Sequence, residues 1–201
     1  MKKTSSQSGF SLVETLVAIT ILLIVITGPL AISSSSAKSS SFSSEQVTAF
    51  FLAQEGVELV EKARDDLLVP YFAGSNPDPW DDFTRTVVGG IYRNCYTTIN
   101  PSGCDFTINT DQTGTLAVTN CAASASACVM YVDKTNGNLR SRYTHVTAGS
   151  TISTPFTRTI TIQPISADEV KVVSRVTWRT GALKAQQEVF VETRFFNMYG
   201  Y

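Results

Sequence analysis

The sequence G-F-S-L-V-E at residues 9–14 leads directly into residues 15–32, which contain no charged side chain. The whole stretch from Phe10 to Ile32 is 23 residues long, Glu14 included. Because roughly 20 mostly apolar residues cross the hydrocarbon core of a bilayer, this stretch is long enough to span a membrane as a helix. The sequence therefore predicts a membrane-spanning helix with a single acid, Glu14, at its start.

Glu14 is the exception within this apolar stretch. An ionisable side chain at membrane depth costs about 2.5 to 3.5 kcal/mol on insertion scales, so it normally has a function and a partner. If the chain were cut between Gly9 and Phe10, the new α-ammonium group of Phe10 would lie at the depth of Glu14, in the same molecule or in a neighbour. The attraction between the two charges grows as the local dielectric constant falls.

The string G-F-S-L-V-E-T-L-V-A-I-T-I-L-L resembles the leader of type IV prepilins and their pseudopilin relatives. The resemblance implies that a prepilin peptidase cuts after Gly9, that Phe10 becomes the N-methylated first residue, and that Glu14 guides docking into a helical filament. It implies other pilin or pseudopilin subunits and the membrane as further partners. Lys2 and Lys3 would stay on the cytoplasmic side of the membrane, with the rest of the chain outside and later in an extracellular or periplasmic filament.

Two other interpretations compete with the prepilin hypothesis. A secretory signal has an apolar region of 7 to 15 residues and a small-residue cleavage site, for which Ser36 and Ala37 are candidates. The apolar run is longer than that, and Glu14 interrupts its start. A plain single-span anchor explains the length but leaves the G-F-S-L-V-E string unexplained.

Composition favours one exported domain on one membrane helix. The chain has 201 residues, of which 192 remain after removal of the leader, and this lies in the single-domain range. The formal charge is -1 and becomes -3 when Lys2 and Lys3 are removed. Since no basic run occurs, we expect no nucleic-acid partner. No phosphate-binding glycine loop is present either, and we expect no cofactor.

A second helical pattern covers residues 44–68. One face carries apolar or small residues at spacings of three and four, and the opposite face is acidic. The apolar face consists of Leu52, Gly56, Leu59, Val60, Ala63 and Leu67. The phrase A-F-F-L-A-Q-E-G-V-E-L-V in this region resembles the corresponding helix of minor pilins and of the I and J types of pseudopilin.

The two helical segments form either one long helix or two helices with a linker. The pair Gly28 and Pro29 and the serine-rich tract at 33–44 are the places where a continuous helix would bend or melt. We divide the chain into a leader at 1–9, an N-terminal helix at 10–69 whose part 10–32 serves the membrane and assembly, and a β-rich exported head at 70–201.

The head begins with turn residues and continues in short threonine-rich alternating runs, which are typical of strands. Residues 70–83 read as a loop. Nine candidate strands follow, at 84–88, 91–98, 105–108, 116–119, 129–132, 139–146, 157–162, 170–178 and 187–196. This is more than one small sheet needs, so we expect some of them to be loop. The predicted fold class is α+β: a long N-terminal membrane-spanning helix packed on a C-terminal antiparallel sheet, which is also the pilin architecture.

The last two strands predict a hairpin with a defined register. Gly181 followed by Ala182 suits a two-residue type II′ turn, which would place Arg175 opposite Glu188 and Lys171 opposite Glu192. The other face of this hairpin would pack on the helix. That face carries Val172, Val176, Trp178, Val189 and Val191.

The four cysteines lie in the exported part, where an even number indicates two disulfides with three possible connectivities. They are Cys95, Cys104, Cys121 and Cys128. Their spacing fits neither a zinc ribbon nor a redox motif. We favour local pairing, in which each bond closes a turn-rich loop. Many major pilins instead close a C-terminal loop with a disulfide, whereas the last 73 residues here contain no cysteine.

No enzymatic pattern emerges. The single histidine, His145, has no base or ligand partner nearby in sequence and is expected to be structural, and no G-x-S-x-G motif occurs. Three acids at Asp78, Asp81 and Asp82 lack the spacing of a known calcium loop, so we expect no metal site. The neighbouring aromatic residues Tyr71, Trp80 and Phe83 are expected to pack in the core or anchor the loop.

These observations predict a structural subunit of minor-pilin type that belongs to a type IV pilus or a related filament. A pseudopilin of a type II secretion system is the alternative within the same class. A membrane-anchored surface-binding protein that never polymerises is the alternative from another class. The sequence does not indicate a ligand for the head.

Overall fold

The computed structural model describes residues 11–75, 78–108, 114–124, 126–133, 142–145, 147, 151–179 and 185–198. The chain divides into two compact units, Met1–Ser44 and Glu45–Tyr201. Helix α1, Leu12–Phe72, contributes residues to both units and runs without interruption through Gly28, Pro29 and the serine-rich tract. The interpretation as two helices joined by a linker is therefore wrong.

The part of α1 in the second unit is helical because its small and apolar residues recur at helical spacing and bury one face. The buried residues are Ala49, Leu52, Ala53, Gly56, Leu59, Val60 and Ala63. On the solvent side, Lys62 and Asp66 form an ion pair one helical turn apart, with Nζ and Oδ2 separated by 2.7 Å. The helix ends beyond Pro70, where Gly74 adopts a positive φ of 72° and its N–H donates to the Tyr71 carbonyl at 2.9 Å.

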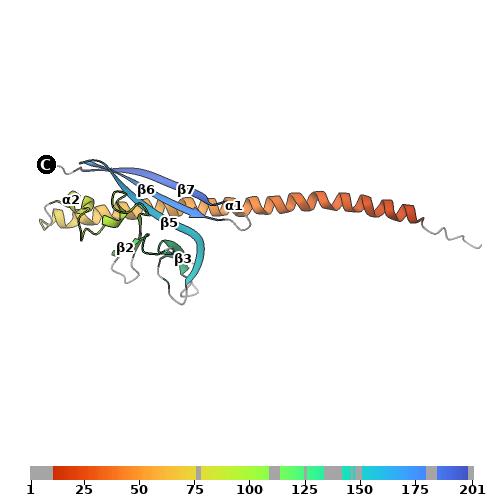
Figure 1. The fold of residues 1–201 in the computed structure, drawn as a ribbon, viewed down its shortest axis with the longest axis horizontal. Coiled ribbons are helices and arrows are strands. Elements are labelled where there is room, and N and C mark those ends of the chain that lie inside the picture. Colours follow the sequence, from red (N-terminus) through yellow and green to blue (C-terminus); the bar gives the residue numbers. More distant parts are fainter. Residues whose placement is uncertain are drawn as a thin grey trace, which may run out of the picture. The chain divides into compact units, whose positions relative to one another are not determined.

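A sheet of seven strands forms the rest of the second unit. The strands are β1 (Cys104–Ile108), β2 (Leu116–Asn120), β3 (Val129–Asp133), β4 (Arg142–Thr144), β5 (Thr151–Ser166), β6 (Glu169–Trp178) and β7 (Gln187–Phe196). Their order is β2-β1-β5-β3-β4, with β6 between β5 and β7, and all named pairs are antiparallel. The predicted α+β class is confirmed: β5, β6 and β7 lie along the yellow part of α1 (Figure 1).

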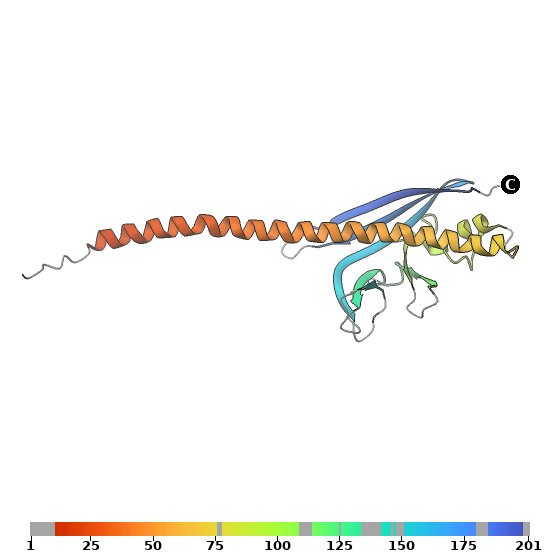
Figure 2. The same ribbon diagram turned by 180° about the vertical axis from the view of Figure 1, so that it is seen from behind.

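The long strand β5 joins the two parts of the sheet. Its first half pairs with β3, and its second half, from Thr157 onward, pairs with β6. Figure 2 shows β5 curving between these two partners. From Phe156 to Ile162 in β5, and throughout β6, every second side chain is buried, as expected for a sheet with one covered face.

The predicted register of the last hairpin is wrong by two residues. Arg175 lies opposite Phe190, not Glu188, and Lys171 lies opposite Arg194, not Glu192. The paired strands end at Trp178 and Gln187, so the connection is longer than a two-residue turn allows. The predicted turn at Gly181 and Ala182 lies outside the described residues.

A slip of two residues keeps every side chain on its original face. The two predicted charge pairs therefore persist as diagonal contacts, with Arg175 Nη1 2.6 Å from Glu188 Oε2 and Lys171 Nζ 3.7 Å from Glu192 Oε2. The predicted inner face is also confirmed. Val172, Val176 and Trp178 are buried, and Val189 and Val191 are half-buried.

Two predicted strands and the predicted loop before them are corrected. Within the region expected to be loop, 70–83, α1 continues to Phe72 and a short helix, α2 (Pro79–Thr84), begins and extends to the first residue of the next predicted strand. The expected strand at 84–88 is absent from these described residues, and the one at 91–98 contains a 3₁₀ turn, η1 (Arg93–Cys95). The cause is a tight reversal: Gly89 has a φ of 95°, and a Cβ on Gly90 would lie 2.4 Å from the Arg85 carbonyl oxygen.

The hydrophobic core of the second unit lies between α1, the α2–η1 region and the sheet. It includes Leu59, Val60, Phe83, Tyr92, Tyr96, Phe106, Ile160, Ile162, Val170, Val172 and Phe195. Buried phenols are satisfied here, since the Tyr96 hydroxyl donates to the Phe83 carbonyl at 3.1 Å. Burial raises the pKa of Tyr96 and, together with the nearby charge of Asp66, that of Tyr92.

Both disulfides join neighbouring cysteines. Cys95 bonds to Cys104, and Cys121 bonds to Cys128. This is the local pairing favoured from the sequence. The first bond lies in the core, where it ties η1 to the start of β1.

Candidate assembly site

The described part of the first unit is helical, and its side chains up to Ser41 are not covered by other described residues. Every side chain from Ser11 to Ser41 is exposed. The large apolar ones include Leu16, Leu22, Leu23, Ile24, Val25, Leu30 and Ile32. Exposed apolar surface on this scale marks a protein interface or a membrane segment.

Three threonine hydroxyls of this segment form hydrogen bonds within the helix. The hydroxyls of Thr15, Thr20 and Thr27 each donate to the carbonyl three residues earlier, at 2.9, 2.8 and 3.2 Å. In an apolar environment such bonds matter, because a hydroxyl without a partner is costly there. The segment can therefore enter lipid or an apolar bundle without leaving these three hydroxyls unpaired.

One helix among the described residues, α1, is long and apolar enough to cross a membrane, judged by length and composition. The apolar window lies near the N-terminus, and none of it is buried by the rest of the protein. The core helix of a soluble protein can be equally long and apolar, but such a helix is mostly buried by the rest of the protein. The segment fits membrane anchoring.

Glu14 lies in the first turn of α1 and is exposed. A carboxylate in the first turn interacts favourably with the unpaired N–H groups and with the positive end of the helix dipole. Among the described residues Glu14 forms no ion pair. The proposed cleavage site between Gly9 and Phe10 lies outside the described residues.

The head half of α1 meets the sheet at Gly56. A Cβ at this position would lie 2.2 Å from the Ser174 Oγ on β6 and 3.1 Å from the Arg158 Cδ on β5. Only glycine allows so close an approach of helix and sheet. The sequence placed Gly56 on the apolar face, but the reason for a glycine there is tertiary.

A buried ion network, which the sequence did not predict, crosses the same contact. The Arg158 Nε donates to both oxygens of Asp105, at 2.8 and 3.0 Å, and both side chains are almost fully buried. Arg158 also donates to the Leu52 and Phe106 carbonyls and to Glu55. The alternation of side chains along β5 could have predicted a buried arginine, because Arg158 lies on the same inward face as Phe156 and Ile160.

The acids considered for calcium have other roles. Asp78 caps α2, and its Oδ1 accepts from the Asp81 N–H at 2.8 Å. Asp81 and Asp82 both face Arg85, whose pKa rises because of the hydrogen bond and the charge of Asp81. No group of three His, Cys, Asp or Glu side chains is placed to hold a metal within the described ranges.

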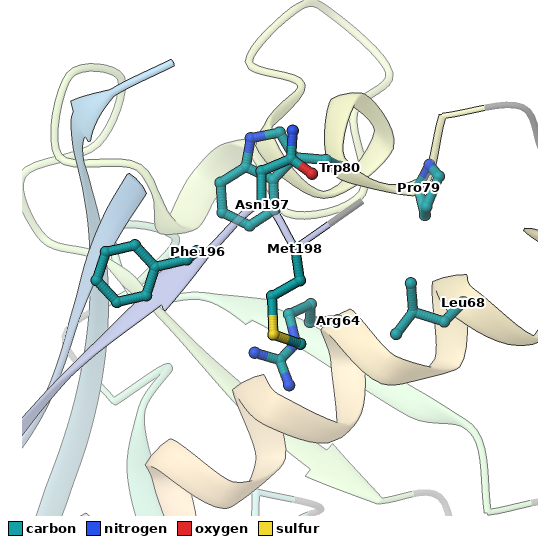
Figure 3. A pocket seen from close by; sticks show the side chains of 7 residues that line it. All are labelled: Arg64, Leu68, Pro79, Trp80, Phe196, Asn197 and Met198. Atoms are coloured by element: carbon teal, nitrogen blue, oxygen red, sulfur yellow. The ribbon is translucent and has the colours of Figure 1, made fainter. Parts of the chain in front are cut away.

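The aromatic residues of this region pack as expected. Phe83 is fully buried and contacts Tyr92 and Phe195, while the Trp80 Nε1 donates to the Ala167 carbonyl at 2.8 Å. Beside Trp80 is a small hollow of about 20 Å³, room for about one water molecule. Figure 3 shows its lining, contributed by α1, α2 and the end of β7: Arg64, Leu68, Pro79, Trp80, Phe196, Asn197 and Met198.

Comparison with known proteins yields a match for the N-terminal segment alone. A family model described as the prokaryotic N-terminal methylation motif matches residues 4–28, which include Gly9, Phe10 and Glu14. Neither the curated proteins nor the solved structures yield a match. The motif implies processing by a prepilin peptidase. The chain thus carries the type IV prepilin leader signature, which supports a type IV pilin-like precursor.

Proposed function

We propose that this protein is a minor-pilin-like structural subunit of a type IV pilus or a related filament. It is stored in the membrane as a prepilin, cleaved between Gly9 and Phe10, and assembled through its N-terminal helix. The supporting observation is the match of the methylation motif to residues 4–28, whose described part is helical and exposed and carries Glu14 in the first turn of α1.

The proposed mechanism is charge pairing in an apolar bundle. After cleavage the Phe10 amine carries a positive charge, which must enter an environment of low dielectric constant when the subunit docks. The Glu14 carboxylate of an adjacent subunit neutralises it there. Leaving one member of a buried charge pair without its partner costs about 3 to 5 kcal/mol, enough to decide whether docking occurs.

A minor subunit is favoured over the major shaft subunit by the cysteine pattern. Both disulfides close short local loops upstream of residue 129, whereas many major pilins use a disulfide to close a C-terminal loop. A pseudopilin of a type II secretion system fits the same helix and motif. The two are distinguished by which filament contains the protein after shearing or secretion-system overexpression.

Glu14→Val tests the mechanism. We expect normal membrane insertion and normal cleavage, because an apolar residue makes the segment more hydrophobic, but loss of incorporation into filaments. Glu14→Gln separates charge from size and should fail in the same way. Thr20→Val, which changes polarity elsewhere on the segment, is the matched control and should assemble normally.

Gly9→Leu tests the processing step. We expect an uncut precursor in the membrane, seen as a larger band on immunoblots, and no protein in sheared filaments. Wild-type protein that keeps its first nine residues would refute the prepilin assignment. Glu14→Val protein at wild-type levels in filaments would refute the charge-pairing mechanism alone. A protein that is cleaved but always stays with membranes would point to the surface-binding alternative.

A further inference from the structure

Strand β7 forms a long edge of the sheet. It has ten residues, and β6 is its only partner among the described strands. The other two edge strands, β2 and β4, have five and three residues. Figure 2 shows β7, the darkest blue strand, along the outer side of β6. The backbone groups of β7 that point away from β6 therefore have no strand partner within the described ranges.

The side chains of β7 alternate between a partly covered face and an exposed face. The exposed face carries charges of both signs and two phenylalanines: Glu188, Phe190, Glu192, Arg194 and Phe196. Phe190 is 55% exposed and Phe196 is 54% exposed. Charges on an edge strand discourage pairing with most strands, but they favour a strand whose charges are complementary. A second β7 strand carries such a pattern.

Most registers between two antiparallel β7 strands are unfavourable. The two copies are related by a two-fold axis through one residue, which lies opposite itself. Residues of the same face lie opposite each other, because alternate residues turn their N–H and C=O groups to the same edge. A register centred on Phe190 places Glu188 opposite Glu192. One centred on Glu192 or Arg194 places two like charges opposite each other at the axis, which is destabilising.

A register centred on Val191 is better but incomplete. It places Glu188 opposite Arg194, which is a favourable pair of charges. It also places Phe190 opposite Glu192. Because the face of an aromatic ring carries negative potential, a carboxylate is a poor neighbour for it.

A register centred on Thr193 pairs both the charges and the rings. Glu192 then lies opposite Arg194, and Phe190 lies opposite Phe196. The two-fold symmetry makes each of these pairs occur twice. Opposite charges and aromatic pairs across neighbouring strands are both favourable, and the exposed rings cover each other.

We propose that the β7 edge binds the β7 edge of a second copy of this chain, antiparallel and centred on Thr193. The outward N–H and C=O groups of the two strands pair with each other, and the sheet continues from one head into the next. The interface uses the same surface on both copies, so it closes at two copies.

The direction of α1 indicates where the second copy comes from. Gly56 lies against Ser174, which pairs with Val191 on β7. Further along the helix, the Arg64 guanidinium lies 4.6 Å from the centre of the Phe195 ring. The head part of α1 and β7 therefore run in the same direction. The two-fold axis reverses both, so the two chains enter the dimer from opposite ends.

This orientation selects the partner. Copies that enter from the same side, such as neighbours in one membrane, have parallel β7 strands and cannot form this pair. The second copy is therefore carried on an opposed membrane or filament, and that these are the carriers rests on the proposed function. The pairing of the two heads itself does not depend on it.

Nanodiscs that each hold one copy of the full chain test the pairing. We expect light scattering to show pairs of joined discs as the protein concentration rises, because the chains enter the dimer from opposite ends. Single discs at every concentration would overturn the proposal. Association of two copies within one disc would overturn it as well, since their β7 strands would be parallel.

Charge reversal tests the register. Glu192→Arg and Arg194→Glu each place like charges opposite each other twice, so each alone should weaken disc pairing by about tenfold or more. A mixture of the two variants restores opposite charges at both places and should pair as wild type does. Because mixing cannot rescue a misfolded variant, this recovery separates lost pairing from lost folding.

Glu188→Arg is the matched control on the same face of β7. It should pair normally, because Glu188 faces no charge in the register centred on Thr193. Loss of pairing in this control would favour the register centred on Val191 and overturn the proposed one. Undiminished pairing of Glu192→Arg alone, or no recovery in the mixture, would do the same.

Glu14→Val separates this inference from the proposed function. It should fail to enter filaments and still join discs, because Glu14 lies far from β7 in sequence and outside the proposed interface. Disc pairing that fails in wild-type protein refutes this inference alone. Disc pairing by a protein that is never found in filaments supports this inference and refutes the proposed function.

Discussion

The two halves of helix α1 have the same backbone structure but depend on different partners. From Ser11 to Ser41 every side chain is exposed, although most large ones are apolar. From Ala49 to Ala63 a stripe of small and apolar residues is buried against the head's own sheet. The apolar half thus lacks cover within the described chain, while the head half already has it.

This difference shows that helical structure alone does not locate the stabilising contacts. The N-terminal half fits membrane anchoring and makes no contact that stabilises the head among the described residues, so we expect changes there to leave the unfolding of the head unaffected. The head half is part of a folded core, so changes there should lower the free energy of unfolding.

The largest expected effect is at Arg158, which joins the head half of α1 to the sheet. Arg158→Met should lower the free energy of unfolding by about 3 to 5 kcal/mol, because Asp105 is left buried without its counter-charge. Denaturant unfolding followed by tryptophan fluorescence measures it. Glu55→Gln, at a half-exposed partner of the same arginine, is the control and should cost less than about 1 kcal/mol.

Leucine truncation compares the halves directly. Leu52 is 4% exposed and Leu22 is 58% exposed. Leu52→Ala should cost about 3 kcal/mol through lost burial and a residual cavity. Leu22→Ala should leave the unfolding of the head unchanged. Equal losses from the two variants in micelles would contradict the division of α1 into two differently supported halves.

Glycine replacement should have opposite signs in the two halves. Gly56→Ala introduces a Cβ that would meet Ser174 Oγ at 2.2 Å, so we expect a loss of about 2 kcal/mol, partly restored by Ser174→Gly. Gly28→Ala meets nothing within 4 Å and should stabilise the helix by up to about 1 kcal/mol. Thermal unfolding and helix content by circular dichroism measure both. A neutral Gly56→Ala would show that the helix and sheet are not in close contact.

The smallest effect is expected on the exposed face of the head. Arg175 and Glu188 form an ion pair at 2.6 Å, but both side chains are roughly half exposed to solvent. Arg175→Gln should therefore change the free energy of unfolding by about 0.5 kcal/mol or less, and less still at high salt. A loss as large as that of Arg158→Met would mean that exposed charges stabilise the head as much as the buried network does.

Some features of the head could be predicted from the sequence because they depend on residues that are close together in the chain. The inward alternation of β6 and β7 is visible in Val172, Val176 and Val189, and the local disulfide pairing agrees with the cysteine spacing. The hairpin register was missed by two residues because it depends on the true length of the connection. The strand expected at 91–98 was wrong because Arg93–Cys95 form a 3₁₀ turn within it.

The sequence alone determined the apolar segment, Glu14 at its start and the prepilin signature, because these depend on residues adjacent in the chain. It also determined the α+β class through helical and alternating periodicities. Only the tertiary structure brought Glu55, Asp105, His145 and Arg158 together, from three strands or strand ends and a helix. Burial and hydrogen-bond partners depend on contacts between residues distant in sequence, so no local pattern can specify them.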